Sequence, residues 1–92
     1  MVKVRISAQA DRALLDTLHY ISQDNPGAAT HLIIDLQKRA VQTLSTFPDA
    51  GVTRHGDLRV LIIRRYTFVY RHDAAKGEVV VLDVFGPGMD WR

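Results

Sequence analysis

The sequence predicts an α+β domain: an N-terminal strand, an αα-hairpin and then a three-stranded antiparallel meander. The meander gives the clearest signal, because runs rich in β-branched and aromatic residues occupy 58–63, 66–71 and 78–84. The turns between these runs are short, so antiparallel pairing of neighbours is the simplest arrangement. Residues 2–6 alternate apolar and basic side chains, which is typical of a short half-buried strand. Helical periodicity from residue 8 to about 45 provides the layer that must cover one face of the sheet.

The helical region divides at the residues Asp24-Asn25-Pro26-Gly27. Ser7 is the expected N-cap of a first helix that runs from Ala8 to about Gln23. Asn25 is the expected cap of a second helix, which begins at Pro26 and ends near Ser45. Because so few residues join the two helices, we expect them to pack as an antiparallel hairpin.

Two faces of the sheet offer apolar side chains to that hairpin. Three aromatic side chains share one face of the middle strand: Tyr66, Phe68 and Tyr70. We expect the hairpin to cover this aromatic face. The last strand leaves a second option open, because its apolar residues include Val80, Leu82 and Val84.

Length and composition limit the class of protein. Ninety-two residues with 47% hydrophobic content indicate one domain spanning residues 1–92. The absence of cysteine excludes disulfides, thiolate metal sites and a cysteine nucleophile. No apolar run approaches the roughly 20 residues of a membrane span, and no signal peptide is evident. A cytoplasmic location is therefore expected.

The net charge is only +2, but the positive charge is concentrated in the sheet half of the chain. Between residues 54 and 72 there are two histidines, the single acid Asp57, and five arginines: Arg54, Arg59, Arg64, Arg65 and Arg71. Such a field suits phosphate groups or an acidic protein. The alternative is that some of these arginines only solubilise a strand edge.

The second helix has more apolar surface than one core-facing stripe requires. Ile34 and Val41 lie off the main stripe and are seven residues apart. One interpretation is a wide sector facing the core. The other is an exposed apolar surface that binds an amphipathic partner helix. The accessibility of these two side chains separates the interpretations.

Candidate catalytic residues are few, and neither a metal nor a cofactor is expected. The four histidines are dispersed over helices and loops, and no glycine-rich phosphate loop opens a helix. Metal-free RNA cleavage would need a base, an acid and cations for the phosphate. Arg59, Arg65 and Arg71 could supply the cations, with His55 as the acid or base. The other proton-transfer candidates are His72, Asp57 and Asp90. No Tyr or His occurs in the last strand or the tail, so binding to acidic partner residues is the favoured role of the arginines.

The order of elements and several short motifs resemble the RelE/ParE superfamily of bacterial type II toxins. The resemblance covers nearly the whole chain. The motifs that carry it are Ile6-Ser7 to Ala10, Asp24-Asn25-Pro26, Phe47-Pro48 with Gly51, Leu58-Arg59, Arg65-Tyr66 leading to Tyr70-Arg71, and Asp90-Trp91-Arg92. Each is short, but their order and spacing together are specific.

Within this superfamily the resemblance implies one of two activities. RelE-like members are mRNA interferases that carry basic sheet residues and a catalytic Tyr or His near the C-terminus. ParE-like members lack that set and poison DNA gyrase. The tail here has neither Tyr nor His, and Phe85-Gly86-Pro87-Gly88-Met89 stands where the family often has His-Gly-Ala-Arg. The ParE-like branch is therefore favoured, with inhibition of gyrase by binding.

Either branch implies a cognate antitoxin, here ParD-like, in a toxin–antitoxin hetero-oligomer. The expected antitoxin-binding residues are Ile34, Val41 and the five arginines. The expected target-binding residues are in the tail: Met89, Asp90, Trp91 and Arg92. Trp91 could instead pack back on the sheet as a lid. Two alternative functions remain open: a ribosome-dependent mRNA endonuclease using His55, Arg59, Arg65 and Arg71, and a non-toxic homologue that only binds antitoxin.

Overall fold

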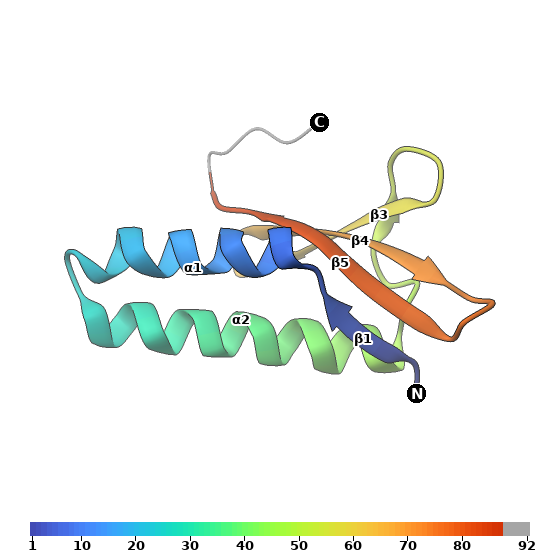
Figure 1. Ribbon diagram of the computed structural model, residues 1–92, viewed down its shortest axis with the longest axis horizontal. Helices are drawn as coiled ribbons and strands as arrows, with labels where there is room; N and C mark the ends of the chain where they lie inside the picture. The colour runs from blue at the N-terminus through green and yellow to red at the C-terminus, as the bar shows by residue number, and fades with distance from the viewer. Residues whose placement is uncertain (88–92) are drawn as a thin grey trace.

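The structure is a computed structural model that describes residues 1–87; residues 88–92 lie outside the described part. Its elements are β1 (Lys3–Ile6), α1 (Ala8–Ser22), α2 (Pro26–Thr46), β2 (Val52–Thr53), β3 (Leu58–Ile63), β4 (Tyr66–Asp73) and β5 (Glu78–Phe85). Figure 1 shows the two helices side by side as one layer against the sheet. The predicted α+β architecture is confirmed.

The sheet has five strands in the order β1-β5-β4-β3-β2. The three predicted meander strands pair antiparallel, while β1 joins the edge of β5 in parallel. Between the helical hairpin and the meander, Val52–Thr53 pair with β3 as the short strand β2, for which the sequence carries no signal. A strand of two residues is too short to show an alternating pattern in the sequence. The parallel pairing of β1 depends on contacts across more than seventy residues, which no local pattern reports.

Both helices begin where their capping residues predict. The Ser7 side chain accepts a hydrogen bond from the Ala10 N–H at 3.1 Å, and Asn25 Oδ1 accepts one from the Ala28 N–H at 3.1 Å. These bonds satisfy N–H groups that the first turn of a helix leaves unpaired. Neither helix of the described chain is both long enough and apolar enough to cross a membrane.

The hairpin covers the aromatic face of the sheet, as predicted. Tyr66, Phe68 and Tyr70 are at most 8% exposed and pack with the buried stripes of both helices. The largest fully buried side chains are Leu14, Leu36, Leu44, Phe68, Tyr70, Val79 and Val81. The opposite face of the sheet receives no helix (Figure 1), and we call it the open face.

A β-bulge in β5 decides which of its valines reach the core. Tyr70 pairs with Val81, but the preceding residue Val69 pairs with Asp83, so Leu82 is an extra residue. The bulge breaks the alternation, and the core receives Val79, Val81 and Val84. The buried valines of β5 therefore do not follow a single alternating series: Val79 and Val81 precede the bulge, and Val84 follows it.

The β3–β4 turn is short and conformationally unusual. Ile63 pairs with Tyr66, so Arg64 and Arg65 alone form the loop, with φ of 49° and 72°. Positive φ at both positions fits the twist of a two-residue hairpin but disfavours side chains with a Cβ. Arg64 Nη1 lies 3.0 Å from Asp35 Oδ2 of α2, and this ion pair ties the turn to the helical layer.

Gly51 precedes β2 at a point where backbone and aromatic side chain approach closely. Its N–H donates a 2.8 Å hydrogen bond to Tyr70 Oη, and a Cβ there would lie 2.5 Å from the Val60 carbonyl oxygen. We predict that Gly51→Ala lowers the free energy of unfolding by about 1–3 kcal/mol, because the overpacked backbone must shift.

Gly27→Ala is the matched control for this substitution. Its added Cβ would meet only Asn25 Oδ1, at 3.8 Å, and alanine is the better helix former. Urea unfolding followed by circular dichroism measures both variants. Equal stability of Gly51→Ala and the wild type would show that the close approach is not a constraint.

Candidate functional site

The strand register separates the arginines of the sheet. Arg59 is directly opposite Tyr70 and so lies on the helix-covered side. Arg71 is opposite Leu58 and Val80, on the open face. The pleat therefore places Arg59 and Arg71 on opposite sides of the sheet.

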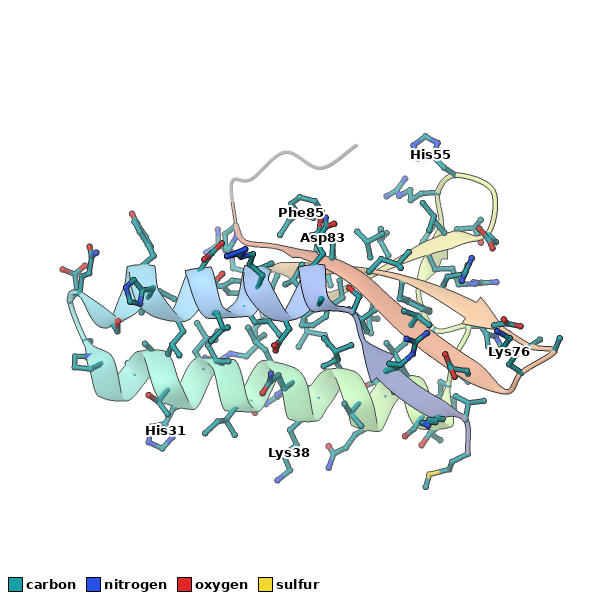
Figure 2. All side chains as sticks on the ribbon, in the orientation of Figure 1. His31, Lys38, His55, Lys76, Asp83 and Phe85 are labelled. Carbon is teal, nitrogen blue, oxygen red and sulfur yellow. The ribbon has the colours of Figure 1, made fainter. Side chains whose placement is uncertain are left out.

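The remaining basic residues of this region lie in loops. Arg64 and Arg65 form the β3–β4 turn, where Arg64 is paired with Asp35 and Arg65 is exposed. Arg54 follows β2, and its N–H donates to the Leu58 carbonyl. His55 lies at the exposed tip of the same loop, where Figure 2 shows it pointing away from the sheet. The residues considered for RNA cleavage thus come from two loops and two faces.

Asp49 is the centre of a polar cluster with His72 and Arg59. His72 Nδ1 lies 2.9 Å from Asp49 Oδ1, and Arg59 Nε lies 3.5 Å from the same oxygen. Arg59 Nη1 also donates to the carbonyls of Gly51, at 2.9 Å, and of Asp49, at 3.3 Å. The loop after α2 is thereby fastened to β3 and β4 by side chains from both strands.

The cluster favours the charged form of its carboxyl group. The hydrogen bond from His72 holds the pKa of Asp49 below its usual value. Desolvation raises this pKa, and the charge of Arg59 lowers it. Beneath it, burial raises the pKa of Tyr70, whose hydroxyl accepts from the Gly51 N–H. Tyr70 is therefore a neutral structural group at physiological pH.

A histidine beside a carboxylate can transfer protons, and here they adjoin one guanidinium group. That guanidinium already donates to two backbone carbonyls. Of the other two arginines of the set, Arg71 is on the open face and Arg65 is in the β3–β4 turn. The contacts of this cluster are those of a structural link between the loop after α2 and strands β3 and β4. His72 is recognisable from its residue type, but its partner Asp49 is not, because 23 residues separate them and no spacing rule joins a loop after a helix to a later strand.

The outer face of α2 is the second candidate surface. Ile34 is 58% exposed and Val41 is 39% exposed. The interpretation of these two residues as part of a wide core-facing sector was wrong; they are on the surface. Lys38 lies between them in the helix and points away from the sheet (Figure 2). We call Ile34, Lys38 and Val41 the α2 outer face.

An ion-pair network borders the α2 outer face. Asp35 Oδ2 lies 2.8 Å from Arg39 Nε and 3.0 Å from Arg64 Nη1. The Arg64 hydrogen bond and, secondly, Arg39 lower the pKa of Asp35. Two cations share one anion, so the network leaves excess positive charge beside exposed apolar side chains.

Two groups of sequence-predicted features remain to be placed. In residues 1–87 no three His, Cys, Asp or Glu side chains gather closely enough to hold a metal ion. The predicted target-binding residues Met89, Asp90, Trp91 and Arg92 lie outside the described residues, so their role stays a prediction.

The fold is shared with the toxins of toxin–antitoxin pairs. The chain is similar to a protein of the chromosomal ParDE system from P. aeruginosa, with 18% identity, a TM-score of 0.76, and coverage of 95% of this chain and 97% of that one. It is also similar to a chain of the RelBE2 complex from Mycobacterium tuberculosis, with 22% identity, a TM-score of 0.70 and coverage of 96% and 93%. A chain of the E. coli RelBE complex has 17% identity and a TM-score of 0.65, with coverage of 97% of this chain and 100% of that one. Curated protein sequences give no match.

Sequence comparison assigns the family more narrowly. The family described as "ParE toxin of type II toxin-antitoxin system, parDE" matches residues 4–91, nearly the whole chain. The chain therefore belongs to the ParE toxin family of type II toxin–antitoxin systems.

The Asp49 cluster makes stability depend on acid in a defined direction. Because folding lowers the pKa of Asp49, its contribution is present above the ordinary aspartate pKa of about 3.9 and is lost as the pH falls through the lowered value. Asp49→Asn should therefore lose less stability than the wild type between pH 7 and about pH 3.

Urea unfolding at the two pH values measures this difference. Asp57→Asn is the control, because Asp57 is exposed and has no ion pair in the described part of the chain. An acid-induced loss in Asp49→Asn as large as that of the wild type would contradict the assigned role of the cluster.

Proposed function

We propose that this ParE-family toxin acts by binding DNA gyrase, and that a cognate ParD-like antitoxin neutralises it. Family membership supports a toxin of this type. The observation that carries binding over catalysis is the placement of Arg59 and Arg71 on opposite faces of the sheet. A catalytic cleft needs acid, base and cations converging on one phosphate. Gyrase is cytoplasmic, so we place the action of the toxin in the cytoplasm.

The tail is the proposed contact with gyrase. In the sequence, Met89, Asp90, Trp91 and Arg92 follow Gly88, the residue after Pro87. Tryptophan and arginine are the side chains most often found as interface anchors. The proposal assigns toxicity to this segment and not to the Asp49 cluster.

Inhibition of gyrase-catalysed supercoiling by the purified toxin tests the proposal. We expect inhibition that grows with toxin concentration. Trp91→Ala should weaken the apparent affinity for gyrase about 30-fold, as expected for the loss of an interface anchor. Leu15→Ala is the matched control, because Leu15 is an exposed apolar residue on α1. Undisturbed supercoiling at saturating toxin would contradict gyrase as the target.

A second function has one observation in its favour. His72 and Asp49 form a hydrogen-bonded pair beside Arg59, which is a partial set for metal-free RNA cleavage. Similar folds also occur in chains of RelBE complexes. A third possibility, a non-toxic homologue, would bind antitoxin tightly and inhibit neither gyrase nor translation.

Antitoxin binding at the α2 outer face follows from its chemistry. An amphipathic helix would bury Ile34 and Val41, and acidic residues on that helix would meet Lys38 and the excess charge of the Arg39–Asp35–Arg64 network. The other arginines of the sheet half could receive an acidic extended segment in the same way: Arg54, Arg59, Arg65 and Arg71.

Substitution of the α2 outer face tests this mode of binding. Ile34→Asp and Val41→Asp should each weaken binding of the co-encoded antitoxin about 10- to 100-fold, because a charge replaces a buried apolar contact. Titration calorimetry measures the affinities. Leu15→Asp on α1 is the control, with a similarly exposed wild-type side chain. Equal affinities for all three variants and the wild type would exclude this face.

A further inference from the structure

The β3–β4 turn has arginine at both positions where other residues are favoured. Arg64 and Arg65 have φ of 49° and 72°, and a two-residue turn with positive φ at both positions most often contains Asn-Gly. A side chain with a Cβ is disfavoured in this conformation, because its Cβ approaches the following carbonyl oxygen. Strained positions of this kind occur preferentially at functional sites. The two guanidinium groups therefore suggest a role for this turn beyond joining two strands.

One aspartate of α2 holds two guanidinium groups beside the turn. Asp35 Oδ2 accepts a hydrogen bond from Arg64 Nη1 at 3.0 Å and another from Arg39 Nε at 2.8 Å. The side chains of Arg64 and Arg39 are 50% and 59% exposed. A guanidinium group has five N–H donors, and Asp35 engages one from each arginine. The two groups are thus fixed in position while other donors on each of them can meet a ligand.

Arg65 adds a third cation next to this pair. It adjoins Arg64 in the turn, it is exposed, and it forms no ion pair within residues 1–87. We call Arg39, Arg64 and Arg65 the turn cluster. Three positive charges and the one negative charge of Asp35 leave a net charge of +2 here. An excess of positive charge on exposed side chains attracts anionic macromolecules.

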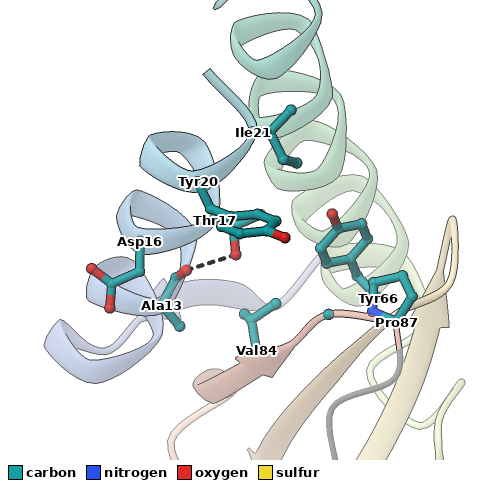
Figure 3. A pocket seen from close by; sticks show the side chains of 9 residues that line it. Ala13, Asp16, Thr17, Tyr20, Ile21, Tyr66, Val84 and Pro87 are labelled. Carbon is teal, nitrogen blue, oxygen red and sulfur yellow. Dashed lines mark hydrogen bonds between the residues drawn. The ribbon is translucent and has the colours of Figure 1, made fainter. Parts of the chain in front are cut away.

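The apolar residues that flank the turn face the core and not the solvent at its tip. Ile63 and Tyr66 both pack with the core. Tyr66 is on the helical side, where it lines a pocket with residues of α1 (Figure 3). A protein interface has an apolar centre, whereas a nucleic acid backbone presents closely spaced phosphate oxygens, which guanidinium groups bind through paired hydrogen bonds. The tip of the turn therefore suits phosphate better than an acidic protein segment.

We propose that the turn cluster binds the phosphate backbone of duplex DNA without reading its sequence. The choice of duplex DNA rests on the proposed function, because gyrase holds duplex DNA while it supercoils it. The toxin then contacts gyrase and the DNA through separate surfaces. An antitoxin helix on the α2 outer face would compete with DNA for Arg39 and Arg64.

Fluorescence anisotropy of a labelled DNA duplex, titrated with the full-length chain at several salt concentrations, tests the proposal. The logarithm of the affinity should fall with the logarithm of the salt concentration with a slope of about −2 to −3, as for two or three neutralised phosphates. Arg39→Gln and Arg65→Gly should each weaken binding about 3- to 10-fold. Each should also make the slope less negative by about 1.

Two controls accompany these variants. Glycine adopts a positive φ without strain, so the urea midpoint of Arg65→Gly should be at or above that of the wild type, and its loss of affinity is then not a loss of folding. Lys76→Gln removes one exposed charge in the β4–β5 turn, at the opposite end of β4 (Figure 2). Its affinity for DNA should stay within about twofold of the wild type.

Three results would overturn the proposal. No binding by the wild type at low salt would show that the turn cluster is not a DNA site. Equal losses in Arg39→Gln, Arg65→Gly and Lys76→Gln would show attraction by net charge alone. Tighter binding of an RNA duplex or of polyglutamate would assign the cluster to that partner.

The anisotropy assay contains no gyrase, so the two proposals can fail separately. Inhibition of supercoiling by a chain that does not bind DNA would refute only the DNA site. DNA binding by a chain that leaves supercoiling undisturbed would refute only gyrase as the target.

Discussion

The coverage of only one face of the sheet by the helical hairpin is the constraint on which the rest of the structure depends. Strand side chains alternate between faces, so one set in each meander strand faces the helices and the other faces away from them. Tyr66, Phe68 and Tyr70 are buried as a result. Val60, Val69 and Val80 belong to the second set and are still buried. The same alternation sends Arg59 to the helix side and Arg71 to the open face. Cationic groups are thereby spread around the molecule instead of converging on one cleft.

The division gives the charged residues different roles. Arg59, Asp49 and His72 fasten the loop after α2 to the sheet, with the Gly51–Tyr70 hydrogen bond beneath them. Arg64 and Asp35 fasten the β3–β4 turn to α2. These contacts join the loop and the turn to the rest of the domain, while exposed apolar and basic side chains remain on the α2 outer face. A small domain built in this way is suited to binding macromolecules through its surface.

Elements with a local signature could be predicted from the sequence, and those that depend on distant contacts could not. The caps Ser7 and Asn25 and the aromatic alternation of β4 each express their structure within a few residues. The bulge at Leu82 and the parallel β1–β5 pairing depend on the whole sheet. The residues of the candidate site also differ in whether a local signal identifies them. His72 was recognised by residue type, whereas its partner Asp49 is brought to it only by the fold.

The claim that this toxin binds its target without cutting RNA is tested most directly by mapping message ends on translating ribosomes. Purified toxin is added to a defined translation reaction, and the 5′ ends of the message are determined by primer extension. Our account predicts the same ends with and without toxin. New ends at ribosome-occupied codons that disappear in His72→Gln would contradict it, and would identify the Asp49–His72–Arg59 cluster as catalytic.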